Sequence, residues 1–426
     1  MGRPPPIPPE AVQPEFRRLR SVAPRGQTGT GMPDCLGVCF LVLALLPTGE
    51  ALALLDERLE LSASQSAYRD DNVLRQPGGS PPSADTYRVT TLGLALDTPV
   101  GDQRLRGALA VNSVRYDSFG EFDLDGHDGQ GVWEWRAGDL KGKLGAAHRR
   151  ALASLGSVQD GVQSRIPNAL TTRRAYASGE AMLGPSWALS LEGSRLEQSN
   201  AAEERRPNDL ALDGGEAVLA YVSRAGNRLG LRGRAARGEL PNPQLLGTAI
   251  DSSYRQRELA AVLDWRPGGH TRLRAHAGRV QRTYEQLPAR DFSGGTWELL
   301  LDWAPGGKLE FGVVAQRAIS DTEEINVSFV LAERVALQAK YRPSALTELS
   351  AVLETADRRY LGDAAQLLGA APARSERLSA AGLQAGYRPL PQVTLSLALR
   401  REKRSDAVGI GAYEVDVAGV GARIGF

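Results

Sequence analysis

The sequence is poor in the features that mark several common classes of protein. It has only 2 cysteines in 426 residues, which excludes a disulfide framework. Neither charge is in excess, because 51 Lys and Arg residues oppose 50 Asp and Glu residues. This balance excludes a strongly basic nucleic-acid-binding protein. No apolar run reaches the roughly 18 residues of a membrane-spanning helix. The length therefore suits either two or three soluble domains or one large barrel.

The first 53 residues differ from the rest of the chain. Residues 1–31 are rich in Pro and Arg and have no periodic apolar pattern, which indicates a disordered extension or a mis-assigned start. The apolar run 36–46 has the length of a secretory h-region, and the small residues around Ala53 fit a cleavage site. We therefore expect a signal peptide over 32–53 and one mature domain over 54–426. A buried hydrophobic helix is the alternative interpretation of the apolar run.

The mature chain alternates between apolar and polar residues almost to its end. In 297–303 the apolar face carries Trp297, Leu299, Leu301 and Trp303, and the same period of two recurs in 392–400. This period indicates half-buried β-strands. The opposite face repeatedly carries charge. A soluble β-sandwich would also alternate, so the pattern alone does not identify the architecture.

The spacing of turns is more informative than the alternation. Short turns with Gly or Pro occur at 98–101, 137–139, 184–186, 225–227, 267–269, 305–307, 342–344 and 388–391. Longer polar stretches lie between them, at 69–85, 118–128, 154–170, 198–212, 240–252, 285–291, 320–324, 359–373 and 405–410. Short turns on one side and long loops on the other are typical of outer-membrane barrels.

These connections predict the fold class. The eight turns and nine loops separate 18 strands, mostly of ten to fourteen residues. Strands that cross a bilayer need about 9–11 residues, whereas strands of soluble proteins usually have about 5–6. We predict an all-β protein, a transmembrane antiparallel up-and-down β-barrel of the Gram-negative outer membrane. Sixteen strands result if 55–68 is not a strand or if one hairpin is miscounted.

Aromatic residues stand just before several of the short turns, on the parity expected to face lipid. They are Trp135, Trp265, Trp303, Tyr341 and Tyr387. Trp and Tyr concentrate where a membrane meets water, so this placement predicts an interfacial aromatic girdle in contact with outer-membrane lipid. Ordinary strand aromatics are the alternative.

The last residues alternate in the same way and end in an aromatic residue. Ile424 and Phe426 lie on the outward parity, and Arg423 lies on the inward parity. A terminal aromatic residue after alternating apolar positions resembles the signal read by the bacterial barrel-assembly machinery. This strand would also close the barrel by pairing with the first strand, which removes both sheet edges.

The inward parity predicts a charged wall. The candidate channel-lining residues are Arg106, Arg136, Glu258, Asp264, Arg272, Arg274, Glu298, Asp302, Arg400 and Arg423, and Arg88 is expected beside them. A wall of mixed charge suits a water-filled channel, and an 18-stranded barrel is wide enough for one. The alternative is that these residues only brace the wall through cross-strand ion pairs.

Catalytic motifs are scarce. The chain has 4 histidines, and none lies in a zinc-protease pattern or beside a nucleophile elbow. We therefore expect no enzyme, no metal site and no cofactor.

Several stretches resemble one family of bacterial barrels. The matching stretches are 71–75, 174–178, 221–231, 290–294, 302–309 and 387–390. They resemble EpsL, the exosortase-associated outer-membrane protein of exopolysaccharide biosynthesis, and the likeness spans the mature chain. The resemblance implies a barrel that helps to export a polysaccharide, with the exopolysaccharide chain and polysaccharide-export proteins as partners. A general diffusion porin and a non-transporting scaffold or adhesin remain alternatives.

Overall fold

The computed structural model describes most of the predicted mature domain. The described residues are 59–78, 81, 83–153, 158–159, 162–163, 166–242, 251–320, 329–362, 374–406 and 411–426. The expected N-terminal extension, signal peptide and cleavage site lie outside the described residues. Within these residues, no helix is long and apolar enough to cross a membrane.

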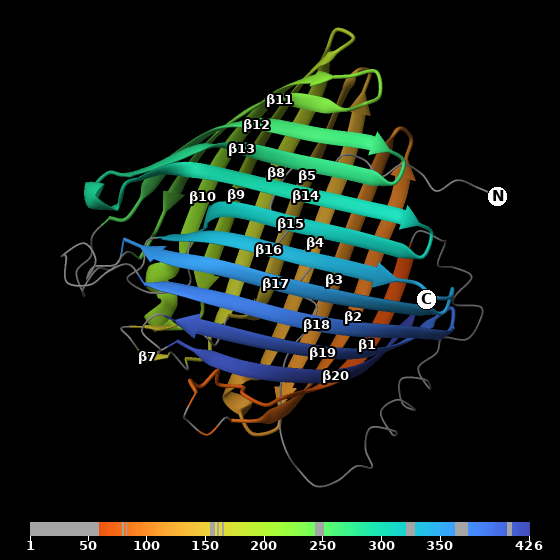
Figure 1. The fold of residues 1–426 in the computed structure, drawn as a ribbon, viewed down its shortest axis with the longest axis vertical. Helices are drawn as coiled ribbons and strands as arrows, with labels where there is room; N and C mark the ends of the chain where they lie inside the picture. Colours follow the sequence, from red (N-terminus) through yellow and green to blue (C-terminus); the bar gives the residue numbers. More distant parts are fainter. Residues whose placement is uncertain are drawn as a thin grey trace.

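The described chain forms one closed 18-stranded antiparallel sheet (Figure 1). The strands are β1 (Leu59–Asp70), β2 (Asp85–Val100), β3 (Gln103–Tyr116), β4 (Leu124–Ala137), β5 (Leu140–Leu152), β8 (Ala169–Leu183), β9 (Trp187–Asn200), β10 (Leu210–Val222), β11 (Arg228–Glu239), β12 (Tyr254–Gly268), β13 (Thr271–Tyr284), β14 (Phe292–Gly306), β15 (Leu309–Ser320), β16 (Phe329–Tyr341), β17 (Thr347–Leu361), β18 (Ser375–Leu390), β19 (Val393–Asp406) and β20 (Tyr413–Gly425). A separate two-residue hairpin is formed by β6 (Val158–Gln159) and β7 (Val162–Gln163).

Each barrel strand pairs with its neighbours in the chain, and β1 pairs with β20 to close the ring. This arrangement is an up-and-down barrel, and it confirms the predicted fold class and the count of 18 strands. Closure matters physically because it leaves no sheet edge with unpaired backbone groups. Figure 1 shows β13–β19 in the near wall crossing in front of the strands of the far wall.

The two ends of the barrel differ. Eight short connections join strand pairs at one end, here called the turn end, and nine longer ones lie at the other, the loop end. Gly101, Gly138, Gly184 and Gly226 have positive φ in the turns, a conformation that glycine adopts without strain. The strands have 12 to 16 residues, more than the predicted ten to fourteen. They are longer because they continue past the apolar belt toward the loop end.

Three of the long connections contain the same hydrogen-bonded turn. Each contains a short 3-10 turn followed by an aspartate: η1 (Gly120–Phe122) before Asp123, η2 (Glu203–Asn208) before Asp209, and η3 (Pro288–Arg290) before Asp291. The aspartate Oδ1 accepts a hydrogen bond of 2.7–2.8 Å from the backbone N–H that ends the preceding strand, at Tyr116, Asn200 and Tyr284. The turns bury Phe122, Arg205 and Arg290. These loops therefore fold back onto the barrel.

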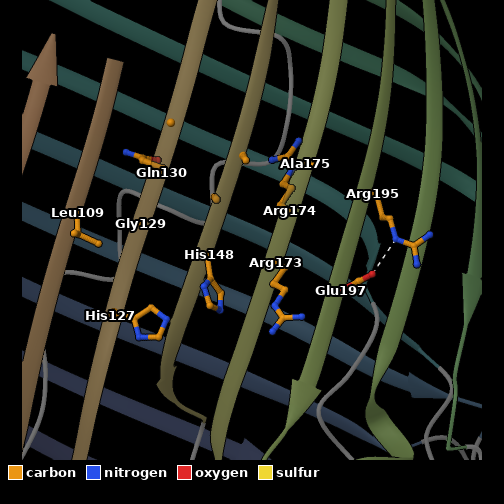
Figure 2. A pocket seen from close by; sticks show the side chains of 13 residues that line it. Leu109, His127, Gly129, Gln130, His148, Arg173, Arg174, Ala175, Arg195 and Glu197 are labelled. Atoms are coloured by element: carbon orange, nitrogen blue, oxygen red, sulfur yellow. Dashed lines mark hydrogen bonds and ion pairs between the residues drawn. The ribbon is translucent and has the colours of Figure 1, made fainter. Parts of the chain in front are cut away.

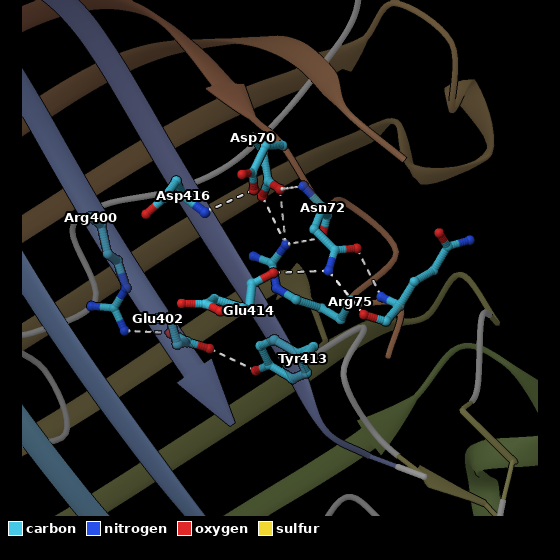
Figure 3. Close-up of polar contacts among 10 residues, drawn as sticks. Asp70, Asn72, Arg75, Arg400, Glu402, Tyr413, Glu414 and Asp416 are labelled. Atoms are coloured by element: carbon cyan, nitrogen blue, oxygen red, sulfur yellow. Dashed lines mark hydrogen bonds and ion pairs between the residues drawn. The ribbon is translucent and has the colours of Figure 1, made fainter. Parts of the chain in front are cut away.

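At the loop end, a polar clamp covers the seam between β1 and β20 (Figure 3). The Arg75 guanidinium donates hydrogen bonds to both carboxylate oxygens of Asp70 at 3.0 and 2.9 Å and to the Asn72 carbonyl at 2.6 Å. The Asn72 amide in turn donates to the Glu414 carbonyl on β20 at 2.9 Å. The clamp therefore joins segments more than 300 residues apart. Arg75 has φ +53°, a strained value for a residue other than glycine.

At the turn end, the same seam is closed by backbone hydrogen bonds. The Leu61 N–H donates to the Phe426 carbonyl at 3.0 Å, and the Phe426 N–H donates to the Leu61 carbonyl at 2.8 Å. The N–H of Gly425 donates to the carbonyl of Gln392. The last two residues therefore pair with the chain on both sides of β20.

Deleting Phe426 is expected to lower the amount of folded barrel in the membrane, because both hydrogen bonds to Leu61 are lost. Phe426→Ser keeps these backbone bonds and removes only the aromatic ring. Heat-modifiable electrophoretic migration of membrane fractions measures the folded population. If both variants lose folded barrel, the ring itself contributes to assembly; an unchanged deletion variant would contradict the prediction.

Candidate functional site: the inward-facing charged wall

The strand register identifies the two faces of the wall, because residues paired across strands point to the same side. One face carries the exposed large apolar residues, such as Leu94, Leu231, Leu259, Leu353 and Leu397. The other face makes contacts that skip intervening strands: Arg228 on β11 donates hydrogen bonds of 2.8 and 2.9 Å to Glu180 on β8. Side chains approach one another in this way on a concave surface. The charged face therefore points inward and the apolar face outward.

The register places all ten candidate channel-lining residues on the inward face. They are Arg106, Arg136, Glu258, Asp264, Arg272, Arg274, Glu298, Asp302, Arg400 and Arg423. Arg88 is a correction: it pairs with Ala67 and shares the outward face with Leu92 and Leu94. The even residues of β2 face outward, so Arg88 could not line the interior.

The inward charges are largely paired with one another near the turn end. The Arg272 guanidinium donates to both carboxylate oxygens of Asp264, at 3.1 and 2.7 Å. Asp264 also lies 3.7 Å from Arg266. Arg274 lies 3.4 Å from Asp302, whose side chain is 63% exposed. The wall is thus mixed in sign, and its acids are held by arginine forks.

Other candidates are buried in a deeper cluster. The Arg232 guanidinium donates to Glu258 at 2.7 Å, and Thr296 on β14 also donates to Glu258, at 3.3 Å. His276 Nδ1 lies 3.7 Å from Glu298. The side chains of Glu258 and Glu298 are only 8% and 6% exposed. These two acids therefore brace the wall, which is the alternative role considered for the inward charges.

Exposed inward charges gather at the turn end. Arg423 on β20 donates to Glu60 on β1 at 2.8 Å, and both side chains are more than half exposed. Arg136 is also exposed. The turn residue Arg342 lies 2.9 Å from Glu348 and also bonds Glu310. Together with the exposed Asp302, these residues form a ring of charges around the turn-end mouth, here called the charged ring.

The loop-end mouth has a different chemistry, which the sequence analysis missed. Seven of the 11 tyrosines lie on the inward face within two residues of the loop end of a strand: Tyr68, Tyr87, Tyr116, Tyr254, Tyr284, Tyr360 and Tyr413. Neighbouring rings stack, with centroids 5.2 Å apart for Tyr68 and Tyr87 and 5.8 Å for Tyr87 and Tyr116. We call this set the tyrosine rim. Its signal in the sequence is a tyrosine beside six of the nine long loops.

Arginine side chains lie against the tyrosine rim. The guanidinium carbon of Arg282 is 3.9 Å from the centroid of the Tyr254 ring, and that of Arg374 is 3.8 Å from Tyr360. At these distances cation–π attraction holds the planar groups against the rings. The interior therefore changes from charge pairs at the turn end to aromatic and arginine planes at the loop end.

The register places the five predicted girdle residues on the outward face near the turn end. Trp265, Trp303, Tyr341 and Tyr387 are each 40–49% exposed. Trp135 pairs with Gly142, and its ring occupies the space a Cβ would take there. Two further outward aromatics at this end, Trp187 and Tyr221, contact each other with centroids 5.9 Å apart. Their interfacial role stays a prediction.

A closed antiparallel barrel with an apolar outer face and a charged inner face is an outer-membrane β-barrel of porin type. Comparison with known families agrees: residues 259–426 match the family described as "Putative beta-barrel porin 2". The protein is therefore located in the outer membrane of a Gram-negative bacterium. In such barrels the short turns are periplasmic and the long loops extracellular, so the charged ring surrounds the periplasmic mouth.

Among solved structures the chain is similar to outer-membrane barrels at low identity. OpdK of Pseudomonas aeruginosa, solved with vanillate, is 12% identical, with 86% of this chain and 99% of that chain covered and a TM-score of 0.46. OccK9 (OpdG) of the same species is 14% identical, with 87% and 98% covered and a TM-score of 0.46. The FrpB iron transporter of Neisseria meningitidis is 10% identical, with 84% and 64% covered and a TM-score of 0.46. No curated protein matches the sequence.

Proposed function

We propose that this barrel is a channel for an exopolysaccharide chain across the outer membrane. The charged ring is the observation that carries the proposal, because it lies where a polymer from the periplasm would enter. The resemblance of the mature chain to EpsL supports the same function. The family name favours a porin for small solutes instead, and this is the second candidate.

The charged ring can bind and release an acidic sugar chain. Its exposed pairs, such as Arg423 with Glu60, contribute only about 0–1 kcal/mol each. A carboxylate on a passing sugar can replace Asp302 or Glu60 at little cost. Arginine suits this exchange because its planar fork matches a carboxylate and stays charged at all relevant pH values.

The tyrosine rim does not present its rings to a passing polymer. Six of its seven side chains are buried, and only Tyr68 is partly exposed. The buried rings pack with neighbouring apolar side chains and with Arg282 at the loop end of the strands. The proposed contacts with the polymer therefore lie at the charged ring, and the rim stabilises the loop end of the barrel.

Two measurements test the proposed channel. Purified protein in planar bilayers should form pores, and oligomers of polygalacturonate added on the turn side should block the current. A strain without the gene should secrete less exopolysaccharide. Pores without polymer block, together with unchanged secretion, would favour the small-solute porin. If no pores form and secretion is unchanged, the scaffold role replaces the channel.

Replacing Arg272 and Arg274 with glutamine should weaken block by polygalacturonate about tenfold, the effect of losing one charge-assisted hydrogen bond. The fold should survive, because Asp264 keeps Arg266 at 3.7 Å and Asp302 is exposed to water. Block by neutral dextran should change little. High salt should reduce the difference, since charges are screened over about 8 Å at physiological ionic strength.

Arg279→Gln is the matched control for this double variant. Arg279 lies on the same strand, β13, but on the outward face, where it donates to Ser293 at 3.1 Å. The control should leave polygalacturonate block unchanged. Equal weakening in both variants would show that the inward arginines have no specific role in the pore.

A further inference from the structure

The outer wall of the barrel carries a groove. It has a volume of about 570 Å³ and is lined by residues of β3, β4, β5, β8 and β9. Leu109, His127, His148 and Arg173 belong to its outward rim. Figure 2 shows both imidazoles and the Arg173 guanidinium in front of their strands, with the opposite wall of the barrel behind. The groove therefore opens toward the membrane.

The groove lies at the upper edge of the apolar belt. Leu109, Gly129, His148, Arg173 and Glu197 form one continuous row across five paired strands. The adjacent outward row on the periplasmic side begins with small residues and includes Gly131, Ala146 and Ala175. The apolar floor is thus on the membrane side, and the polar rim is toward the extracellular side.

The rim has an excess of positive charge. Among the described residues, neither Arg150 nor Arg173 forms an ion pair, and both are exposed. Arg150 pairs with His127 in the register and stands diagonally to Arg173, a separation of about 7–8 Å between their backbones. His127 on β4 pairs with Arg150, and His148 on β5 pairs with Arg173, so the two imidazole rings stand beside the two arginines, with centroids 4.7 Å apart.

Acidic residues near the rim already have partners. Glu197 accepts a hydrogen bond from Arg195 at 2.9 Å, and Asp213 also accepts one from Arg195, at 3.1 Å. Asp125, next to His127 on the outward face, is bound to Arg115 at 2.7 Å. On other strands, several outward arginines, such as Arg317 and Arg377, have acidic partners. Asp125 also attracts Arg150, but it forms its hydrogen bonds with Arg115, so Arg150 and Arg173 keep guanidinium groups that no ion pair occupies among the described residues.

Gly131 in the floor is not required by the packing of this chain. A Cβ at Gly131 would meet no atom within 4 Å. By contrast, a Cβ at the inward Gly145 would collide with the ring of Tyr176, so that glycine makes room for an internal neighbour. Glycine weakens a strand, and its use at Gly131 gains nothing inside the protein. Gly131 therefore leaves open space on the outward face, which a molecule outside the protein can occupy.

We propose that this groove binds a phosphate-bearing lipid of the outer leaflet. An acyl chain lies over Gly129, Gly131, Ala146 and Ala175, and the phosphate group lies between Arg150 and Arg173. The imidazoles of His127 and His148 donate further hydrogen bonds to it. Guanidinium groups bind phosphate strongly and with two-pronged geometry. A symmetric contact with the groove of a second copy is disfavoured, because it would place the same cations against each other.

The experiment compares binding of diphosphorylated lipid A with binding of its dephosphorylated form to the purified barrel in detergent, measured by native mass spectrometry. Arg150→Gln with Arg173→Gln should weaken retention of the diphosphorylated lipid about tenfold or more. It should leave the dephosphorylated lipid unaffected. Arg257→Gln is the control, since Arg257 is an exposed outward arginine of β12 that forms no ion pair among the described residues.

A second variant tests the floor without changing charge. Gly131→Leu with Ala175→Leu should fill the groove and weaken retention of both lipids, while heat-modifiable migration shows that the barrel still folds. Equal lipid retention in all variants would overturn the proposal. So would a change of oligomeric state in the filled variant with lipid retention unchanged, because the groove would then be an interface between barrels.

Discussion

Replacing Arg75 with alanine is expected to destabilise the folded barrel by about 3–5 kcal/mol, because one partner of a buried ion pair is lost. The Asp70 side chain is fully buried, and the equally buried Asp85 lies directly opposite it in the register. Burial by itself lowers the pKa of Arg75, but the charge of Asp70 and their hydrogen bonds raise it above its usual value. The guanidinium is therefore charged, and without it the buried Asp70 carboxylate loses its ion-pair partner.

Chemical denaturation in detergent or lipid vesicles, followed by tryptophan fluorescence, measures this effect. Arg69→Ala is the matched control. Arg69 precedes Asp70 on the same strand but is exposed on the outward face, so its removal should change stability by no more than about 0.5 kcal/mol. Adding Asp70→Asn to Arg75→Ala should recover part of the loss, because the uncompensated charge is then gone. Equal stability of Arg69→Ala and Arg75→Ala would mean that the clamp does not hold the seam.

This clamp illustrates what the sequence could not reveal. The stretch 71–75 was recognisable by its resemblance to other barrels, but its role depends on contacts with Glu414 and Asp416 on the last strand. No local pattern indicates a partner more than 300 residues away. The strands themselves were predictable, because alternation and turn residues are local properties that a barrel must satisfy at every position.

The inward face also combines properties that a local pattern predicts with properties that depend on strand pairing. Parity placed Glu298 and Asp302 on the inward face, and the register agrees. Their surroundings differ completely, since Glu298 is 6% exposed and Asp302 is 63% exposed. Both are carboxylates on one face of one strand, four residues apart. What separates them is packing against Arg232, His276 and other side chains from neighbouring strands, and that packing becomes visible only after the strands are paired.

The outer groove escaped the sequence analysis for a related reason. The histidines were weighed only as catalytic residues, and in the sequence His127 and His148 are 21 positions apart. Pairing of β4 with β5 brings their rings to 4.7 Å and places Gly129 and Arg150 beside them. A glycine in an alternating strand also gives no sign of whether an internal ring or an external ligand fills the space above it.

Leu301→Arg is expected to destabilise the barrel by about 2–4 kcal/mol, whereas Leu300→Arg should change stability by less than about 1 kcal/mol. Leu301 pairs with Leu273 and Val313 on the outward face, between Trp297 and Trp303. A guanidinium there enters hydrocarbon without a partner. Leu300 pairs with Arg274 and Val314 on the inward face, and an arginine there has the exposed carboxylate of Asp302 two residues away.

The two leucines are adjacent in the chain and point to opposite faces. The two variants therefore differ mainly in whether the new arginine faces outward or inward. Both receive the same residue on the same strand at nearly the same membrane depth. Denaturation from lipid vesicles should therefore give a difference of roughly 2 kcal/mol or more between them. If the barrel were surrounded by water rather than lipid, arginine would be tolerated at Leu301 as well as at Leu300. Equal stability of the two variants would thus contradict the membrane placement of this face. If Leu300→Arg were much less stable than Leu301→Arg, the assignment of inward and outward faces would be reversed.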